Sequence, residues 1–305
     1  MSTAPFEALD PRFARYALGN VHLERLYTGC RWAEGPAYVP AGRYLVWSDI
    51  PNNRVMRWDE TDNSVSVFMQ PAFHSNGHTL DRQGRLVSCE HSGRCVSRTE
   101  YDGRRTVLAD RFEGRRLNSP NDVVVKSDGS LWFTDPTYGI DSDYEGDAAE
   151  SEIGASQVYR IDPNSLAVTC VISDMVRPNG LAFSPDEQWL YVADTGLSHV
   201  PNGPRHLRRF RVNASGQGVS GGEIWATATV GVFDGFRCDV EGNVWAGAGD
   251  GVHCIAPDGT LIGKVRVPEV VANVCWGGAK RNRLFICGTT SLYAIYLGTK
   301  GVIWA

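Results

Sequence analysis

The chain has 305 residues, a net charge of −5 and a pI near 5.8. This acidic balance argues against a nucleic-acid-binding surface, because binding the phosphate backbone requires clustered Lys and Arg. No stretch approaches the roughly 18 apolar residues of a membrane-spanning helix, and the N-terminus lacks the apolar core of a signal peptide. We therefore expect neither a nucleic acid nor a membrane as a partner.

In chain order, residues 1–19 show no strand alternation and are expected to form an irregular or short helical lead-in. Residues 20–305 are expected to form one domain, because no Pro- or Ser-rich linker divides them and a single repeat covers nearly all of them. Residues 21–26 alternate between apolar and polar side chains as a strand does, but they precede the first copy of the repeat.

The repeat is a β-hairpin whose second strand is rich in β-branched and aromatic residues. A polar residue, the leader, stands just ahead of each first strand, and the second strands begin about every 40–59 residues. This period is typical of one four-stranded propeller blade. The six leaders are Glu34, Asn76, Asn121, Asn179, Asp234 and Asn273.

Six copies predict an all-β fold, a six-bladed β-propeller of four-stranded antiparallel blades. The orphan strand at 21–26 is predicted to complete the last blade from outside, because ring closure removes exposed sheet edges. Two connections are longer than a hairpin needs, at 196–206 and at 138–157, and the second contains the acidic stretch 141–152. That stretch is either a lid or binding loop or a solvated surface loop.

The innermost strand of each blade runs beside the axis, so the six leaders are predicted to form a ring at one height. They offer carboxylate and amide oxygens, which hard divalent cations prefer. Asn and Asp also suit tight entries into strands, which explains one or two leaders better than six in phase. Four acidic residues end second strands and either orient the ligands or serve the local turns. They are Asp49, Glu90, Asp135 and Asp194.

Four motifs match a known family in order and spacing: AEGP at 33–36, SPNDV at 119–123, RPNGLAF at 177–183 and FDG at 233–235. With them the chain resembles the SMP-30/gluconolactonase/LRE family. TDPTYG at 134–139 and DGVH at 250–253 bring it nearest to the bacterial gluconolactonases.

The resemblance implies a six-bladed propeller with one divalent cation at its axis. Carried over by motif, the ligands would be Glu34, Asn179 and Asp234, with Asn121 as a further ligand or a substrate contact. Ca²⁺ is the first expectation, and Mg²⁺, Mn²⁺ or Zn²⁺ could substitute. One position departs from the animal members, because Ser119 stands where they have a substrate-binding arginine.

These features predict hydrolysis of a small sugar lactone, with the cation polarising the carbonyl and Asp234 as general base. Asp234 could also be purely a structural ligand. Asn121, Asn76, Asp135 and Tyr138 are the expected substrate contacts. A phosphotriester hydrolase on the same metal platform and a non-catalytic binding propeller are the alternatives.

No Gly-x-Ser-x-Gly nucleophile motif is present. Three histidines could transfer protons, although a lone histidine is more often a packing residue: His78, His91 and His253. The eight cysteines form no CxxC pair and lie mostly in strand-like runs, which favours buried free thiols in a cytoplasmic protein.

Overall fold

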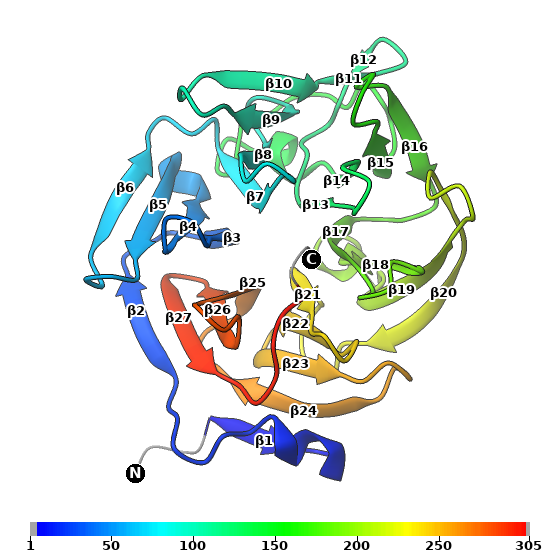
Figure 1. Ribbon diagram of the computed structural model, residues 1–305. Helices are drawn as coiled ribbons and strands as arrows, with labels where there is room; N and C mark the ends of the chain where they lie inside the picture. Colours follow the sequence, from blue (N-terminus) through cyan, green and yellow to red (C-terminus); the bar gives the residue numbers. More distant parts are fainter. Residues whose placement is uncertain (1–4, 303–305) are drawn as a thin grey trace.

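A computed structural model describes residues 5–302, in which antiparallel sheets are arranged as a ring around a central axis (Figure 1). Within those residues six sheets follow one another in chain order, and each contributes four strands to one blade. The predicted six-bladed propeller is thereby confirmed. The first strand of each blade contacts the first strands of its two neighbours, so these six strands line the axis.

The first three blades have the following strands. Blade one contains β3 (Ala33–Val39), β4 (Tyr44–Asp49), β5 (Arg54–Asp59) and β6 (Val65–Met69). Blade two contains β7 (Ser75–Leu80), β8 (Leu86–Glu90), β9 (Cys95–Thr99) and β10 (Arg105–Ala109). Blade three contains β13 (Val123–Val125), β14 (Leu131–Asp135), β15 (Gln157–Ile161) and β16 (Val168–Ile172). A small separate hairpin contains β11 (Arg111–Phe112) and β12 (Arg115–Arg116).

The last three blades complete the ring. Blade four contains β17 (Pro178–Phe183), β18 (Trp189–Asp194), β19 (His206–Val212) and β20 (Val219–Thr227). Blade five contains β21 (Phe236–Cys238), β22 (Val244–Ala248), β23 (Gly251–Ile255) and β24 (Leu261–Arg266). Blade six contains β25 (Val271–Gly277), β26 (Arg283–Gly288), β27 (Ser291–Tyr296) and, from the other end of the chain, β2 (Glu24–Thr28).

Strand β2 closes the ring as predicted, although it lies slightly later in the chain than the expected 21–26. It pairs antiparallel with β27, with Glu24 opposite Ala294 and Thr28 opposite Ser291. The first and last parts of the chain therefore share one sheet, which joins the two ends of the propeller and covers the outer edge of β27.

The predicted irregular lead-in is wrong in one respect, because it contains a strand. Strand β1 (Phe6–Ala8) pairs with β24 and adds a fifth strand to blade five, and the 3₁₀-helix η1 (Pro11–Arg15) follows it. The Phe13 side chain of η1 is fully buried. Three residues of strand are too short for alternation to be recognised in the sequence. Residues 1–4 of the predicted lead-in lie outside the described residues.

The core lies between the blades, where the faces of neighbouring sheets pack together. Val87 and Cys89 of blade two, for example, form one apolar cluster with Val123 and Phe133 of blade three. Burial of such surfaces is the main driving force for folding. All eight cysteines are free, and all except the half-buried Cys170 are buried, as the sequence predicts.

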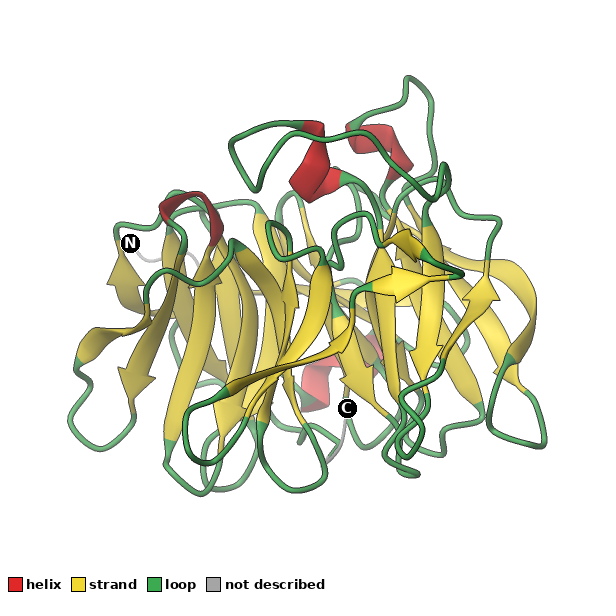
Figure 2. Ribbon diagram, turned by 90° about the horizontal axis from the view of Figure 1, so that it is seen from above, coloured by secondary structure: helices red, strands yellow, loops and turns green. Residues whose placement is uncertain are grey.

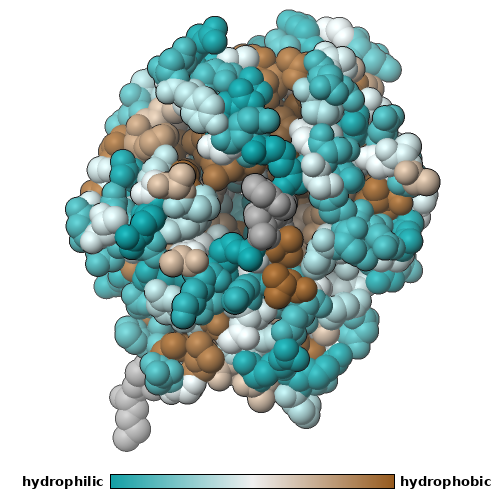
Figure 3. Space-filling view, in the orientation of Figure 1, coloured by the Kyte–Doolittle hydropathy of each residue, from teal (hydrophilic) through white to brown (hydrophobic). Residues whose placement is uncertain are grey.

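First strands begin, and second strands end, at one face of the ring, which we call the leader face. The two long connections rise from it and carry α1 (Tyr138–Asp141) and η3 (Gly196–Ser198), while η2 (Ile50–Asn52) follows β4 on the same face. Figure 2 shows the long loops and their short helices standing above one end of the strands. Figure 3 shows a largely hydrophilic surface on the side seen in Figure 1. Within residues 5–302, no helix is both long and apolar enough to cross a membrane.

Candidate active site

Four leaders from consecutive blades form a hydrogen-bonded arc around the axis. Asn76 Nδ2 donates to Asn121 Oδ1 at 2.6 Å, and Asn121 Nδ2 donates to Asn179 Oδ1 at 2.7 Å. Asn179 in turn hydrogen-bonds Asp234. The first three side chains are buried and that of Asp234 is half-buried. The leaders thus lie at one height, as their common phase predicts.

The remaining leaders, Glu34 and Asn273, pair with each other through a hydrogen bond. Glu34 Oε2 also accepts from the backbone N–H of Gly35 at 2.7 Å. Gly35 has a φ of +53°, and a Cβ atom there would lie 1.9 Å from the carbonyl oxygen of Asn76. Only glycine allows blades one and two to approach this closely, so the residue after Glu34 fixes the spacing of the ring.

Glu34 and Asp234 are the two carboxylates of the ring, and their environment disfavours their negative charges. Burial raises the pKa of each, and the charges of Glu34 and Asp122 raise that of Asp234 further. The Oδ1 atom of Asp234 is buried without a hydrogen-bond partner among the described residues. A divalent cation would supply the missing partner and neutralise the repulsion, and the carboxylate and amide donors suit a hard ion.

Such an ion would depend on amide oxygens. Residues 5–302 contain no group of three or more His, Cys, Asp and Glu side chains that could hold a metal ion. Glu34 and Asp234 supply only two carboxylates, so Asn121 and Asn179 are needed to complete a ligand set. Their Oδ1 atoms lie within the hydrogen-bonded arc described above.

Three of the acids that end second strands hold the chain just ahead of a leader. Asp49 Oδ1 accepts from Arg31 N, Asp135 Oδ2 from Asn118 N, and Asp194 Oδ1 from Arg177 N, each at 2.9 Å. The fourth acid, Glu90, instead pairs with Arg105. These carboxylates therefore set the entry of the chain into the inner strands.

Asp135, an expected substrate contact, is fully buried, and its Oδ1 atom has no hydrogen-bond partner within residues 5–302. Burial raises its pKa to about 7. Its observed interaction is with Asn118, which precedes the leader Asn121. A direct contact between Asp135 and a substrate stays a prediction.

Tyr138 lies at the rim of the leader face, where the two long loops meet. Its hydroxyl hydrogen-bonds Thr195 Oγ1, which also accepts from Asn179 Nδ2 at 3.4 Å. Arg177 lies over the Tyr138 ring, and its Nη1 atom donates to Asp141 Oδ2 at 2.8 Å. The tyrosine is thus connected to a predicted metal ligand through one intervening hydroxyl.

Ser119, at the position where animal members carry an arginine, is buried and structural. Its hydroxyl donates to the carbonyl oxygen of Pro136 at 2.7 Å and accepts from the backbone N–H of Gly139 at 2.9 Å. The side chain thereby fastens the start of the long acidic loop to the inner strand of blade three. This position therefore carries no positively charged side chain.

Of the three histidines considered from the sequence, only His91 contacts the leaders. Its Nε2 atom lies 3.5 Å from Asn76 Nδ2. His78 is bonded between Ser48 and Ser88, and His253 is bonded to Asp250 at 2.7 Å. Both ring nitrogens of His78 are thus bonded within the protein, whereas His253 Nδ1 is buried without a hydrogen-bond partner among the described residues.

A buried ion pair beside the ring was not predicted from the sequence. Asp122 follows the leader Asn121, and its Oδ2 atom pairs with Arg237, which lies three residues after Asp234. Glycine follows four of the six leaders, whereas an aspartate follows Asn121. This departure from the pattern is the sequence feature that could have drawn attention to Asp122.

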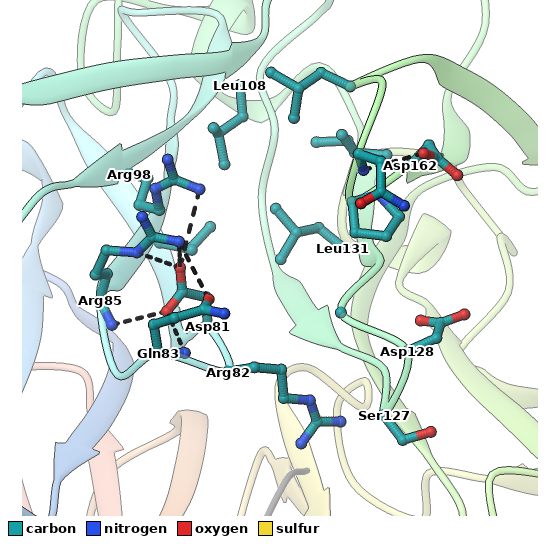
Figure 4. A pocket seen from close by; sticks show the side chains of 16 residues that line it. Asp81, Arg82, Gln83, Arg85, Arg98, Leu108, Ser127, Asp128, Leu131 and Asp162 are labelled. Carbon is teal, nitrogen blue, oxygen red and sulfur yellow. Dashed lines mark hydrogen bonds and ion pairs between the residues drawn. The ribbon is translucent and has the colours of Figure 1, made fainter.

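Two cavities open away from the leaders. One of about 340 Å³ lies between blades two and three, where Figure 4 shows Asp81 bonded to Arg85 on one wall and Leu131 and Asp162 on the other. The other, of about 390 Å³, is lined by residues including Tyr38, Trp276 and Arg237. Neither lining includes a leader. The two cavities are therefore separate from the ring of leaders.

Comparisons with known proteins agree with this architecture. Residues 32–290 match the family described as SMP-30/gluconolactonase/LRE-like region. A gluconolactonase from Zymomonas mobilis is 30% identical, over 96% of this chain and 86% of that protein. The solved structure of a gluconolactonase from Xanthomonas campestris is 37% identical with a TM-score of 0.89, over 96% of this chain and 94% of that one.

A third comparison supports the fold alone. Regucalcin from Agrobacterium tumefaciens, described as a calcium-binding protein, has a TM-score of 0.73 at 22% identity, over 91% of this chain and 94% of that one. The resemblance seen in the sequence motifs is confirmed by the match over residues 32–290 and by the gluconolactonase relatives. The chain belongs to the SMP-30/gluconolactonase/LRE-like family.

Proposed function

We propose that this protein hydrolyses a small sugar lactone to the open hydroxy acid, with a divalent cation held at the leader face. The chain is a lactone-hydrolysing enzyme by its family and its gluconolactonase relatives. The observation that carries the finer proposal is the placement of two carboxylates, the buried Glu34 and the half-buried Asp234, in a ring of amides. A non-catalytic propeller would have no reason to keep these charges together in a buried ring. The phosphotriester alternative has no support from these relatives.

Glu34, Asn121, Asn179 and Asp234 would hold the cation. When bound, it polarises the lactone carbonyl and stabilises the negative charge that develops on the carbonyl oxygen. Ca²⁺ is the ion we propose, because the available donors are all oxygens. The regucalcin comparison is compatible with this choice but, at 22% identity, supports only the fold.

The residues of the chain orient the substrate and move protons. Asp234 is the general base of this proposal and accepts a proton from the attacking water. Asp234 then returns the proton to the ring oxygen of the lactone as the C–O bond breaks. Asn76, Asn121 and Tyr138 present amide and hydroxyl groups to the substrate's hydroxyls. The hydrogen bonds of Asn76 with Asn121 and of Tyr138 with Thr195 hold these groups in place before the substrate arrives.

The test is an assay of the purified protein on glucono-1,5-lactone, before and after chelation and after return of Ca²⁺. We expect activity to disappear with chelator and to return with the ion. Glu34→Gln keeps the shape of the side chain but removes its charge, so its affinity for the ion should fall sharply.

Two results would contradict the proposal. One is an active enzyme that contains no stoichiometric metal by elemental analysis. The other is a metal-loaded protein that hydrolyses phosphotriesters but no sugar lactone. That result would support the phosphotriester hydrolase instead.

A further inference from the structure

The acidic loop that follows β14 turns inward at one point, Glu145. Residues 141–144 and 147–150 are exposed, whereas Glu145 is half-buried and Gly146 is buried. The backbone of Gly146 packs against Gly139 so closely that a Cβ atom would lie 2.1 Å from the Gly139 carbonyl oxygen. The loop is therefore folded back onto the leader face at this point and does not extend into solvent there.

His91 fixes this inward turn. Its Nδ1 atom lies 2.9 Å from the backbone carbonyl oxygen of Glu145. A carbonyl oxygen can only accept, so Nδ1 must carry the proton of the imidazole, and burial lowers the pKa of His91 to about 4, which keeps the ring neutral. Nε2 is then an acceptor that faces the Asn76 amide. One ring thus connects the loop backbone to the hydrogen-bonded leaders.

Glu145 lies close to the ring of leaders. Its backbone carbonyl oxygen is 2.9 Å from His91 Nδ1, and the Nε2 atom of the same ring is 3.5 Å from Asn76 Nδ2, so one imidazole separates Glu145 from a leader. Within residues 5–302 no group hydrogen-bonds its carboxylate or forms an ion pair with it. Its oxygens are not among the buried side-chain atoms that lack a partner, so they are accessible to a molecule that enters from the leader face.

The arginine at the rim of the leader face is engaged elsewhere, and no arginine stands at position 119. Arg177 donates to Asp141 and lies over the Tyr138 ring, and Ser119 contributes only a hydroxyl that is already bonded within the protein. The Glu145 carboxylate is therefore available to accept hydrogen bonds from neutral donors that enter from the mouth. A lactone bearing several hydroxyl groups is a ligand with such donors.

We propose that Glu145 is a substrate-binding residue that determines specificity, accepting hydrogen bonds from the hydroxyl groups of the lactone while His91 positions the loop that carries it. This inference rests on the proposed function. It assigns the acidic loop the role of selecting polyhydroxylated lactones over unsubstituted ones. It also places this selection on a loop of blade three, where Ser119 supplies no charged contact.

The test compares Glu145→Gln with wild type on two substrates, glucono-1,5-lactone and the unsubstituted δ-valerolactone. Hydrogen bonds to a charged group support a loss in kcat/KM of about 10- to 100-fold on the hydroxylated lactone, chiefly through KM. Activity on δ-valerolactone should change by less than about 3-fold, as expected for a surface change that leaves the fold intact. Glu150→Gln, the same chemical change at an exposed position of the same loop, is the matched control.

Each result decides between possibilities. Equal losses on both lactones together with reduced metal content would show that Glu145 acts on the metal site, which overturns the inference. An unchanged ratio of the two kcat/KM values would also overturn it and would leave the proposed function intact. A wild-type protein that is fully metal-loaded but inert on both lactones would reject the proposed function, and the role of Glu145 with it.

Discussion

The Nη1 atom of Arg237 lies 3.3 Å from the Oδ2 atom of Asp122, and both side chains are at most 3% exposed. The pair joins the inner strand of blade five to the start of blade three, across the axis and directly beside the leaders. Arg237 Nη1 also donates to the carbonyl oxygen of Phe236 at 2.8 Å. The pair thus connects two blades that are not neighbours in the ring.

Removing one partner of this pair should destabilise the whole propeller. Arg237→Met would leave the Asp122 charge buried and unpaired, a change that typically costs about 3–5 kcal/mol. Urea unfolding should show a lower midpoint with an unchanged slope. The double variant Asp122→Asn with Arg237→Met removes both charges and should be more stable than Arg237→Met alone. A double variant that loses the sum of the two single losses would contradict the pairing.

The N-terminal segment should contribute to stability through Phe13. Its ring is fully buried against Trp245, at a centroid separation of 6.1 Å, in the core beneath blade five. Phe13→Ala should cost about 3–5 kcal/mol, because it removes a buried aromatic ring and leaves a cavity. Leu9→Ala, at a neighbouring side chain that is 49% exposed, is the control and should cost less than about 0.5 kcal/mol. Equal midpoints for wild type and Phe13→Ala would show that the segment is not part of the folded core.

Much of this fold was predictable because the propeller repeats one local pattern six times. Period-two alternation, turn residues and a polar leader recur in each copy, so errors in one blade do not affect the count. Strand β1 was missed because three residues carry no periodicity of their own and are a strand only through β24. Tertiary pairing decides such a segment, and local propensity does not.

The arrangement of the leaders was predictable for the same reason, whereas the roles of the individual residues stay predictions. The ring of leaders follows from phase alone, since equivalent positions on inner strands must lie at equal height. Glu145 and Arg237 could not be found in this way, because their places depend on how a long loop folds back and on contacts across the axis. The acidic residues around Glu145 are similar in sequence, and only burial separates it from its exposed neighbours.

His78 should make stability depend on pH. The side chain is 1% exposed, and burial lowers its pKa to about 4 from an ordinary value near 6.5. The folded protein therefore favours the neutral ring, and the unfolded chain binds a proton more readily between these two values. The lowered pKa of His78 therefore adds about 3 kcal/mol to the free energy of unfolding above about pH 6.5, and this stabilisation is lost as the pH falls toward about 4.

The measurement compares the free energy of unfolding of wild type and His78→Gln between pH 8 and pH 5. Other groups titrate in this range, so the quantity to follow is the difference between the two proteins. The advantage of wild type over the variant should shrink as the pH falls. A constant difference across the range would mean that the pKa of His78 is the same in the folded and unfolded states.

Asp234→Asn should separate catalysis from binding. Asparagine retains an oxygen that can contact a metal ion, but it cannot accept a proton at neutral pH. General-base contributions are typically about 10²–10⁴-fold, so kcat should fall by that amount while KM rises much less. Elemental analysis of the same preparation establishes how much metal the variant holds.

Asp102→Asn, at an exposed turn remote from the leaders, makes the same chemical change and should keep full activity. A metal-loaded Asp234→Asn protein with near-normal kcat would remove Asp234 from the role of base and leave it as a structural ligand.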